Sequence, residues 1–145
     1  MIKIICLGKI KEKYLNDLIN DYQKRITKYH KIEIIELKDE NNLEKEKNNI
    51  LKYINIQDYV IALDIDGENL TSIELAQKID KIFLTNGTIT FIIGSSEGLH
   101  SDIKQRADYR LSFSKLTFPH GLFRGILLEQ IYRSFKIINN ETYHK

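Results

Sequence analysis

The stretch that decides the fold is Thr88–Gly98, TITFIIGSSEG, in which an apolar run ends directly in a loop between two glycines. Similar runs of apolar and β-branched residues recur along the chain, and segments with helical periodicity separate them. Strands that alternate with helices predict an α/β fold, with a mostly parallel sheet flanked by helices. The predicted strands are Ile2–Leu7, Ile32–Leu37, Tyr59–Ile65, Thr88–Ile93 and Tyr109–Phe113.

Local signals mark where the helices begin and where the chain turns. Thr71 and Glu74 match a capping box at the start of a helix, and either Ser101 or Asp102 is expected to cap a short one. The pair Asp66-Gly67 predicts a turn that closes the third strand. The predicted helices are Tyr14–Tyr29, Leu43–Ile54, a segment from Thr71 to Leu84, the short helix that Ser101 or Asp102 caps and that ends at Ala107, and His120–Asn139.

Composition places the chain among ordinary globular proteins. It has 145 residues, of which 42% are hydrophobic, so we expect a single domain over residues 1–145 with a core of its own. Its one cysteine, Cys6, allows no disulfide framework and favours a reducing compartment. No signal peptide or run of about 20 apolar residues is found, so we expect a cytoplasmic protein without a membrane segment.

The charge is unevenly distributed along the chain. The net charge is only +2, yet Ile103–Lys145 holds eight Lys and Arg against three Asp and Glu. A basic region on a nearly neutral protein is typical of a phosphate or RNA contact, although a solvated helix face rich in lysine explains it equally well.

The last predicted helix is apolar around well over half of its circumference. A single sheet buries about 100° of an amphipathic helix, so the remaining apolar surface indicates a second partner, and a homodimer is the natural one. Gly125 lies inside this helix, where it costs about 1 kcal/mol relative to alanine. Close approach of another backbone would offset that cost. Burial of the helix within the core is the alternative.

The loop after the fourth strand also matches G-x-S-x-G, with Ser96 at the nucleophile position, followed by Asp102 or Asp108 and then by His120 in hydrolase order. A serine hydrolase is therefore an alternative. Against it stand the missing HGGG-type loop, the small number of strands, and the position of His120 directly after Pro119 at a helix start. The chain contains no dinucleotide-binding or P-loop motif, and its four histidines and one cysteine lack the spacing of metal ligands.

Two backbone-rich loops remain as the candidate site. One follows the fourth strand, and the other is Phe113–His120. Main-chain groups from two such loops suit a ligand recognised by the edge of a planar base and by ribose hydroxyls, with apolar side chains covering its ring. Phe113, Leu116 and Phe118 are the candidates for that cover.

These segments, taken together, resemble the RlmH family of SPOUT methyltransferases, which are 23S rRNA (pseudouridine(1915)-N(3))-methyltransferases. The resemblance extends over the full length of the chain. The segments that carry it are Ile4–Lys9, Leu63–Gly67, Phe91–Leu99, Leu111–His120, Arg124, Leu128–Arg133 and Tyr143–Lys145.

The resemblance implies a C-terminal trefoil knot, a homodimer, and S-adenosyl-L-methionine as the cofactor. A knot is not something that periodicity predicts, because threaded chains are rare. Where the family usually has two successive glycines, this chain has Gly94-Ser95, and a serine there could narrow the cofactor loop. The implied cofactor-binding positions are Leu63, Gly94, Phe113, Ser114, Lys115, Leu116, Thr117 and Phe118.

For catalysis, the resemblance implies Tyr143 and His144 in the tail together with Arg133. The target nitrogen must lose a proton, so a general base or a cation that stabilises the resulting anion is required. The implied substrate is 23S rRNA in the large subunit or the assembled ribosome, and no metal is implied. The competing hypothesis is a non-catalytic RNA- or ribosome-binding module that has lost the cofactor through Ser95.

Overall fold

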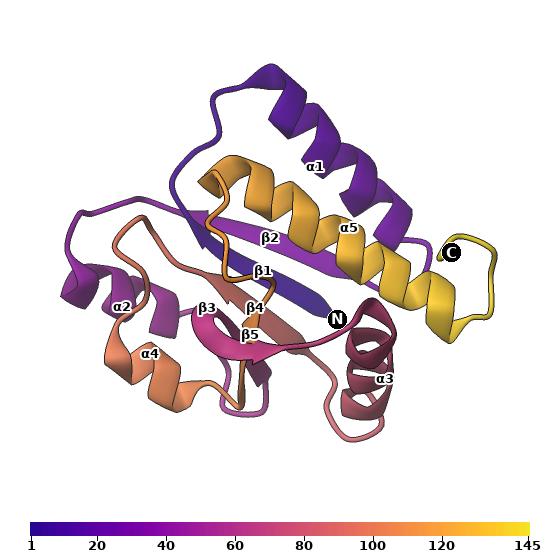
Figure 1. The fold of residues 1–145 in the computed structure, drawn as a ribbon. Coiled ribbons are helices and arrows are strands. Elements are labelled where there is room, and N and C mark those ends of the chain that lie inside the picture. Colours follow the sequence, from indigo (N-terminus) through magenta and orange to yellow (C-terminus); the bar gives the residue numbers. More distant parts are fainter.

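The computed structural model describes residues 1–145 and contains one five-stranded sheet with the strand order β2-β1-β4-β3-β5, in which every pair is parallel. The predicted α/β fold with a parallel sheet is therefore confirmed (Figure 1). The elements are β1 (Ile2–Leu7), α1 (Lys13–Ile26), β2 (Ile32–Leu37), α2 (Leu43–Leu51), β3 (Tyr59–Asn69), α3 (Ser72–Ile82), β4 (Ile89–Ile93), α4 (Ser101–Arg106), β5 (Tyr109–Ser112) and α5 (His120–Ile138).

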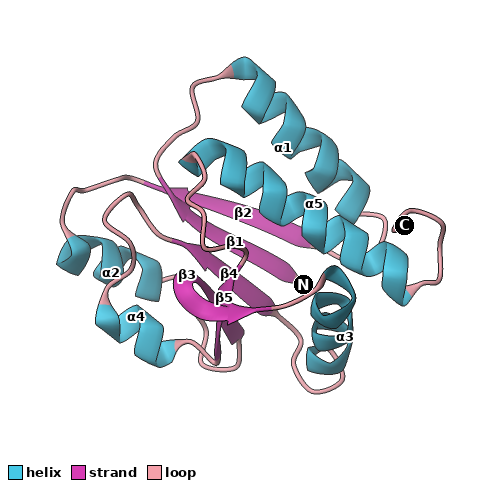
Figure 2. Cartoon of the chain, viewed as in Figure 1, coloured by secondary structure: helices cyan, strands magenta, loops and turns pink.

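The helices cover the sheet in two layers (Figure 2). Helices α1, α3 and α5 pack on one face, over a buried cluster that includes Ile4, Phe91 and Ile131. Helices α2 and α4 cover the other face, over a smaller cluster that includes Ile5 and Ile92. Because successive side chains of a strand point to opposite faces, β1 and β4 contribute to both clusters, which is why they read as continuous apolar runs.

Strand β3 is longer than predicted and curls around β5. Leu111 of β5 is paired with Leu63 on one stretch of β3 and with Glu68 on another, with a register shift between the two. The turn predicted at Asp66-Gly67 is wrong, because this pair lies inside β3, where the strand bends around its neighbour (Figure 1). The trefoil knot itself stays a prediction.

Helix α5 finds its second partner inside the chain. It packs between α1 and α3 over the sheet, and of its apolar side chains only Leu122 is exposed. A Cβ atom on Gly125 would lie 2.6 Å from Leu18 Cδ2 of α1, so this glycine permits a close approach of two helices. Much of the apolar surface of α5 is therefore covered within its own chain, and the homodimer stays a prediction.

Two of the predicted helix starts can be compared with the caps. The capping box is confirmed, because Glu74 N–H donates to Thr71 Oγ1 and Thr71 N–H donates to Glu74 Oε1. Helix α4 is capped differently from the prediction. The Nδ1 atom of His100 accepts from Asp102 N–H, and neither Ser101 nor Asp102 is the cap.

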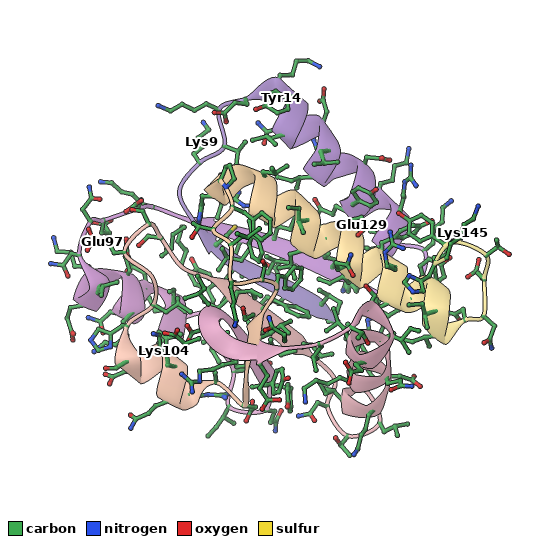
Figure 3. The ribbon with its side chains drawn as sticks, viewed as in Figure 1. Lys9, Tyr14, Glu97, Lys104, Glu129 and Lys145 are labelled. Carbon is green, nitrogen blue, oxygen red and sulfur yellow. The ribbon has the colours of Figure 1, made fainter.

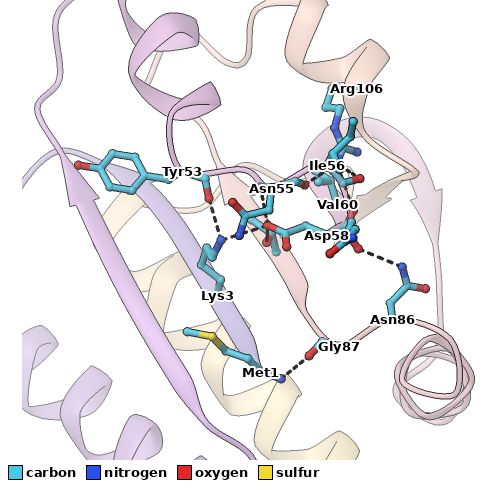
Figure 4. A network of polar contacts seen from close by, with 12 residues as sticks. Met1, Lys3, Tyr53, Asn55, Ile56, Asp58, Val60, Asn86, Gly87 and Arg106 are labelled. Atoms are coloured by element: carbon cyan, nitrogen blue, oxygen red, sulfur yellow. Dashed lines mark hydrogen bonds and ion pairs between the residues drawn. The ribbon is translucent and has the colours of Figure 1, made fainter.

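A polar network closes the sheet at the amino ends of its strands (Figure 4). Lys3 Nζ lies 3.0 Å from Asp58 Oδ2, and both side chains are buried. The same carboxylate oxygen accepts from Thr90 Oγ1 and from Asn55 N–H. These polar contacts occupy the amino end of the sheet, and the cavities described below lie at the opposite end.

No helix combines the length and the apolar character that a bilayer crossing requires.

Candidate cofactor and RNA site

The carboxyl ends of β3, β4 and β5 surround a cavity of about 210 Å³. Ligands of open α/β sheets bind at this edge, where the loops diverge from the strand ends. The cavity is lined by the ends of β3 and β4, the glycine loop after β4, and the loop between β5 and α5. Its lining residues are Leu63, Asp64, Ile65, Ile93, Gly94, Ser95, Gly98, Leu111, Ser112, Phe113, Ser114, Leu116, Thr117, Phe118, His120 and Phe123.

The structure brings seven of the eight residues predicted for cofactor binding to this cavity. Lys115 is the exception, because its side chain is exposed and does not line the cavity. Sequence reasoning missed the remaining strand and helix residues of the lining, which are Asp64, Ile65, Ile93, Leu111, Ser112 and Phe123. Phe123 carried a signal, since it is an apolar residue one helical turn after Pro119.

Aromatic side chains form one wall of the cavity. The Phe123 ring packs edge to face on Phe113, with centroids 5.1 Å apart, and stacks on Phe118 at 5.9 Å. Beside them, Leu116 leaves 74% of its surface exposed. Such a wall, next to the hydroxyl groups of Ser114 and Thr117, suits a ligand with a flat ring and polar substituents.

Gly94 is required by the path of the glycine loop. A Cβ atom there would lie 2.5 Å from the carbonyl oxygen of Gly98, which belongs to the backbone of the same loop. Any side chain at this position would therefore push the loop away from its present course.

The Ser95 side chain is bonded to helix α2. Its hydroxyl donates to Glu46 Oε1 of α2 at 3.0 Å, and both residues are buried. The other oxygen of Glu46 accepts from Glu40 N–H. Burial, reinforced by the nearby Asp39 carboxyl group, raises the pKa of Glu46. The serine thus anchors the glycine loop to α2, a contact for which the sequence contains no local signal.

The serine hydrolase alternative is wrong. Ser96 is exposed and its hydroxyl bonds to no residue, while His120 Nε2 donates to the Leu7 carbonyl oxygen at 2.8 Å. Asp102 pairs with Lys47 rather than with His120. No nucleophile, base and acid are therefore in contact at this loop.

The chain's last residues are held on α5. Asn140, with φ of 55°, ends the helix in a Schellman motif, in which Glu141 N–H donates to the Lys136 carbonyl and Asn140 N–H to that of Ile137. Glu141 then accepts from Tyr29 Oη at the end of α1.

The three residues predicted for catalysis lie together in this region. Arg133 Nη1 donates to His144 Nδ1 at 3.1 Å, and Tyr143 Oη donates to Glu129 Oε1 at 3.2 Å. The Arg133 guanidinium also lies 4.8 Å above the Tyr143 ring. Burial raises the pKa of Tyr143 above its ordinary value, so this phenol stays protonated and positions the tail.

These three residues do not reach the cavity of their own chain. Arg133 is 13 positions after His120 on α5, which corresponds to about 20 Å along the helix axis. Figure 3 shows Lys145 at the opposite end of the molecule from Glu97 of the glycine loop.

The basic C-terminal region is mostly neutralised. Six of its eight Lys and Arg residues form ion pairs, and only Lys115 and Lys145 do not. Arg124 is buried against Glu36 and donates to the Gly8 carbonyl, while its Nε atom has no partner in the protein. The charge count in this region is therefore a poor guide to an RNA surface.

The fold matches those of two solved structures. A TrmH/SpoU tRNA-modifying enzyme of A. aeolicus superposes with a TM-score of 0.52 at 13% identity, covering 95% of this chain and 77% of the other. The SpoU methyltransferase AviRb of Streptomyces viridochromogenes superposes with a TM-score of 0.51 at 10% identity, covering 98% and 62%. At such low identity these likenesses establish the fold alone, that of the SpoU class.

Sequence comparison then defines the family. The family model described as "Predicted SPOUT methyltransferase" matches residues 1–144. A protein of Clostridium botulinum (strain Hall) named ribosomal RNA large subunit methyltransferase H is 51% identical, and one of Methanococcus maripaludis, with the same name given provisionally, is 52% identical. Each alignment covers 99% of both chains. The chain therefore belongs to the SPOUT methyltransferase family.

Proposed function

We propose that this protein transfers a methyl group from S-adenosyl-L-methionine to N3 of a pseudouridine, position 1915, in large-subunit rRNA. It would act as a single domain over residues 1–145, in the cytoplasm, on the large subunit or the assembled ribosome. The observation that carries the proposal is the cavity between the glycine loop and the Phe113–His120 loop. The names of the relatives at about 50% identity support rRNA as the substrate.

The residues around this cavity fit the cofactor. The close contact of Gly94 with the Gly98 carbonyl creates a smooth backbone wall that a Cβ atom would disturb, and Phe113 and Phe118 would cover the adenine ring. Main-chain groups of Ser114–Thr117 would bind its polar edge. When bound, the cofactor supplies a methyl group on a positively charged sulfur, so the protein has to place the target nitrogen in line with it.

Removal of the N3 proton is the second task. Arg133 carries a fixed positive charge and would stabilise the anion that the base becomes as its proton leaves. His144 Nδ1 is occupied by Arg133, so it can accept a proton only when that hydrogen bond opens. Tyr143, which remains protonated, would hold Glu129 and Arg133 in position.

A homodimer would bring these parts together. Because the tail lies about 20 Å from the cavity along α5, a second copy of the chain is the simplest source of Arg133 and His144 for each cavity. The same assembly would provide the RNA surface.

The test is transfer of a labelled methyl group from S-adenosyl-L-methionine to ribosomes that lack the modification, with the labelled base mapped. Label at N3 of the expected pseudouridine supports the proposal. Label on another nucleotide, or no label while the cofactor is bound, refutes the assigned substrate. Failure to bind the cofactor would leave the non-catalytic RNA-binding module as the explanation.

A further inference from the structure

A second cavity lies where the chain reverses direction across the sheet. After β1 the chain passes to α1 on one face, and after neighbouring β4 it passes to α4 on the other face. Loops that leave adjacent strands toward opposite faces create a crevice between them, and ligands of open α/β sheets bind there. A cavity of about 300 Å³ occupies this position, between the β1–α1 loop and the glycine loop.

The second cavity adjoins the first and has a different set of lining residues. Ser95 and His120 line both cavities, whereas Lys9 and Ser96 line only the second. Only two of its 11 lining residues are hydrophobic. A ligand here would thus lie beside whatever fills the first cavity, and it would be recognised by hydrogen bonds.

The wall of the second cavity has one acceptor without a partner. His120 Nε2 donates to the Leu7 carbonyl, so in the neutral imidazole Nδ1 is an acceptor, and it has no partner in the protein. Arg124 also lines the cavity, but its unpartnered Nε atom is buried and a ligand in the cavity does not reach it. The N–H group of a uracil-type base would satisfy His120 Nδ1.

Free positive charge gathers around the same cavity. Lys9 and Lys11 follow β1, and Lys38 follows β2 next to it; all three are exposed and none has a carboxylate partner. Lys9 lies at the upper side of the molecule in Figure 3. The cavity also has two acids, Glu12 and Asp39, which would keep a phosphate out of the interior and leave it at the lysine rim.

We propose that this second cavity receives the target nucleotide of the RNA. The uracil-type base enters it and bonds through an N–H group to His120 Nδ1, while the flanking phosphates contact Lys9, Lys11 and Lys38. This rests on the proposed function and adds the place and orientation of the substrate. It also assigns the RNA surface to the loops after β1 and β2 rather than to the ion-paired C-terminal region.

Ser96→Trp is the most direct test. Ser96 is exposed, bonds to nothing and lines only the second cavity, so an indole there would obstruct it while leaving the fold intact. We expect kcat/KM for ribosomes to fall at least about tenfold, with the affinity for S-adenosyl-L-methionine unchanged. Unchanged kinetics would place the nucleotide elsewhere, and a loss of cofactor affinity would make the cavity part of the cofactor site. Either result overturns the inference.

The lysine rim is tested by salt dependence. Lys9→Ala and Lys11→Ala should each lower the slope of log K against log salt for rRNA binding by about 1, which is the signature of a lost phosphate contact. Lys24→Ala, an equally exposed and unpaired lysine near the far end of α1, is the matched control and should leave the slope unchanged. Equal slopes for all three variants would show that Lys9 and Lys11 do not contact the RNA phosphates, which overturns the proposed role of the lysine rim.

The two proposals fail in distinguishable ways. If the wild-type protein transfers no methyl group, the proposed function fails, while the salt slopes still decide whether the lysine rim binds RNA. If the wild-type protein is active and Ser96→Trp is equally active, only the inference about the second cavity fails.

Discussion

Gly94→Ala tests whether the glycine loop forms the cofactor site. The new Cβ atom would lie 2.5 Å from the Gly98 carbonyl oxygen and 2.8 Å from its carbon, both in the backbone. A backbone cannot rotate away as a side chain can, so the loop must either remain strained or shift. Overpacking of this kind costs about 1 to 3 kcal/mol.

The two outcomes appear in different measurements. If the loop shifts, affinity for S-adenosyl-L-methionine falls by a factor of about 5 to about 140, since each 1.4 kcal/mol is tenfold. If the loop stays strained, the free energy of unfolding falls by a similar amount. Titration calorimetry with the cofactor and thermal unfolding of the free protein therefore have to be done on the same variant.

Gly87→Ala is the matched control, because a Cβ atom at Gly87 would have nothing within 4 Å and the position has no positive φ. This variant should change neither quantity. Two results would refute the reasoning. One is a Gly94→Ala protein that behaves like the control, and the other is a large loss of stability with wild-type cofactor affinity, which would separate the loop from the cofactor.

Three further predictions concern other parts of the molecule. Deleting Tyr143–Lys145 should abolish methyl transfer while cofactor affinity remains within about twofold, because the tail lies about 20 Å from the cavity of its own chain; wild-type turnover would exclude the tail from catalysis. Glu46 has a raised pKa, so the folded state holds its proton more tightly than the unfolded state, and stability should fall as the pH rises from about 4 through that pKa. In Glu46→Gln this fall should disappear from melting curves recorded across the range, and an unchanged pH profile would contradict it. Gly125→Ala should lower the free energy of unfolding by about 1 to 3 kcal/mol, because its Cβ would lie 2.6 Å from Leu18 Cδ2. Adding Leu18→Ala relieves this clash, but if α1 cannot close the gap, the stability regained should be smaller than the stability lost with the leucine side chain. Full additivity of the two changes would show that the two residues do not interact.

Local sequence signals were sufficient for most of the fold. The bounds of β1 and β2 follow from apolar runs that end in glycine or lysine, and the start of α3 follows from its capping box. The curl of β3 could not be predicted, because Asp66-Gly67 is a turn signal in any local rule. Its actual conformation is set by pairing with β5, more than 40 positions later.

The candidate site was likewise predictable only where local sequence determines it. Loop composition and the family resemblance identified most of the lining of the first cavity, because those residues are adjacent in sequence. Glu46 was missed, since its contact with Ser95 joins residues 49 positions apart. The position of the tail relative to the cavity could not be predicted from the sequence either, because the direction of α5 across the sheet decides how far Arg133 lies from the cavity.

The curl of β3 also constrains the order in which the chain can be assembled. Residues 59–69 leave the ribosome before residues 109–112, so the end of β3 is made before the strand with which it pairs. The pairing of Glu68 and Asn69 cannot form until that later strand is present. We therefore expect residues 64–69 to remain open until β5 is available, which makes the last third of the chain the step that completes the native topology.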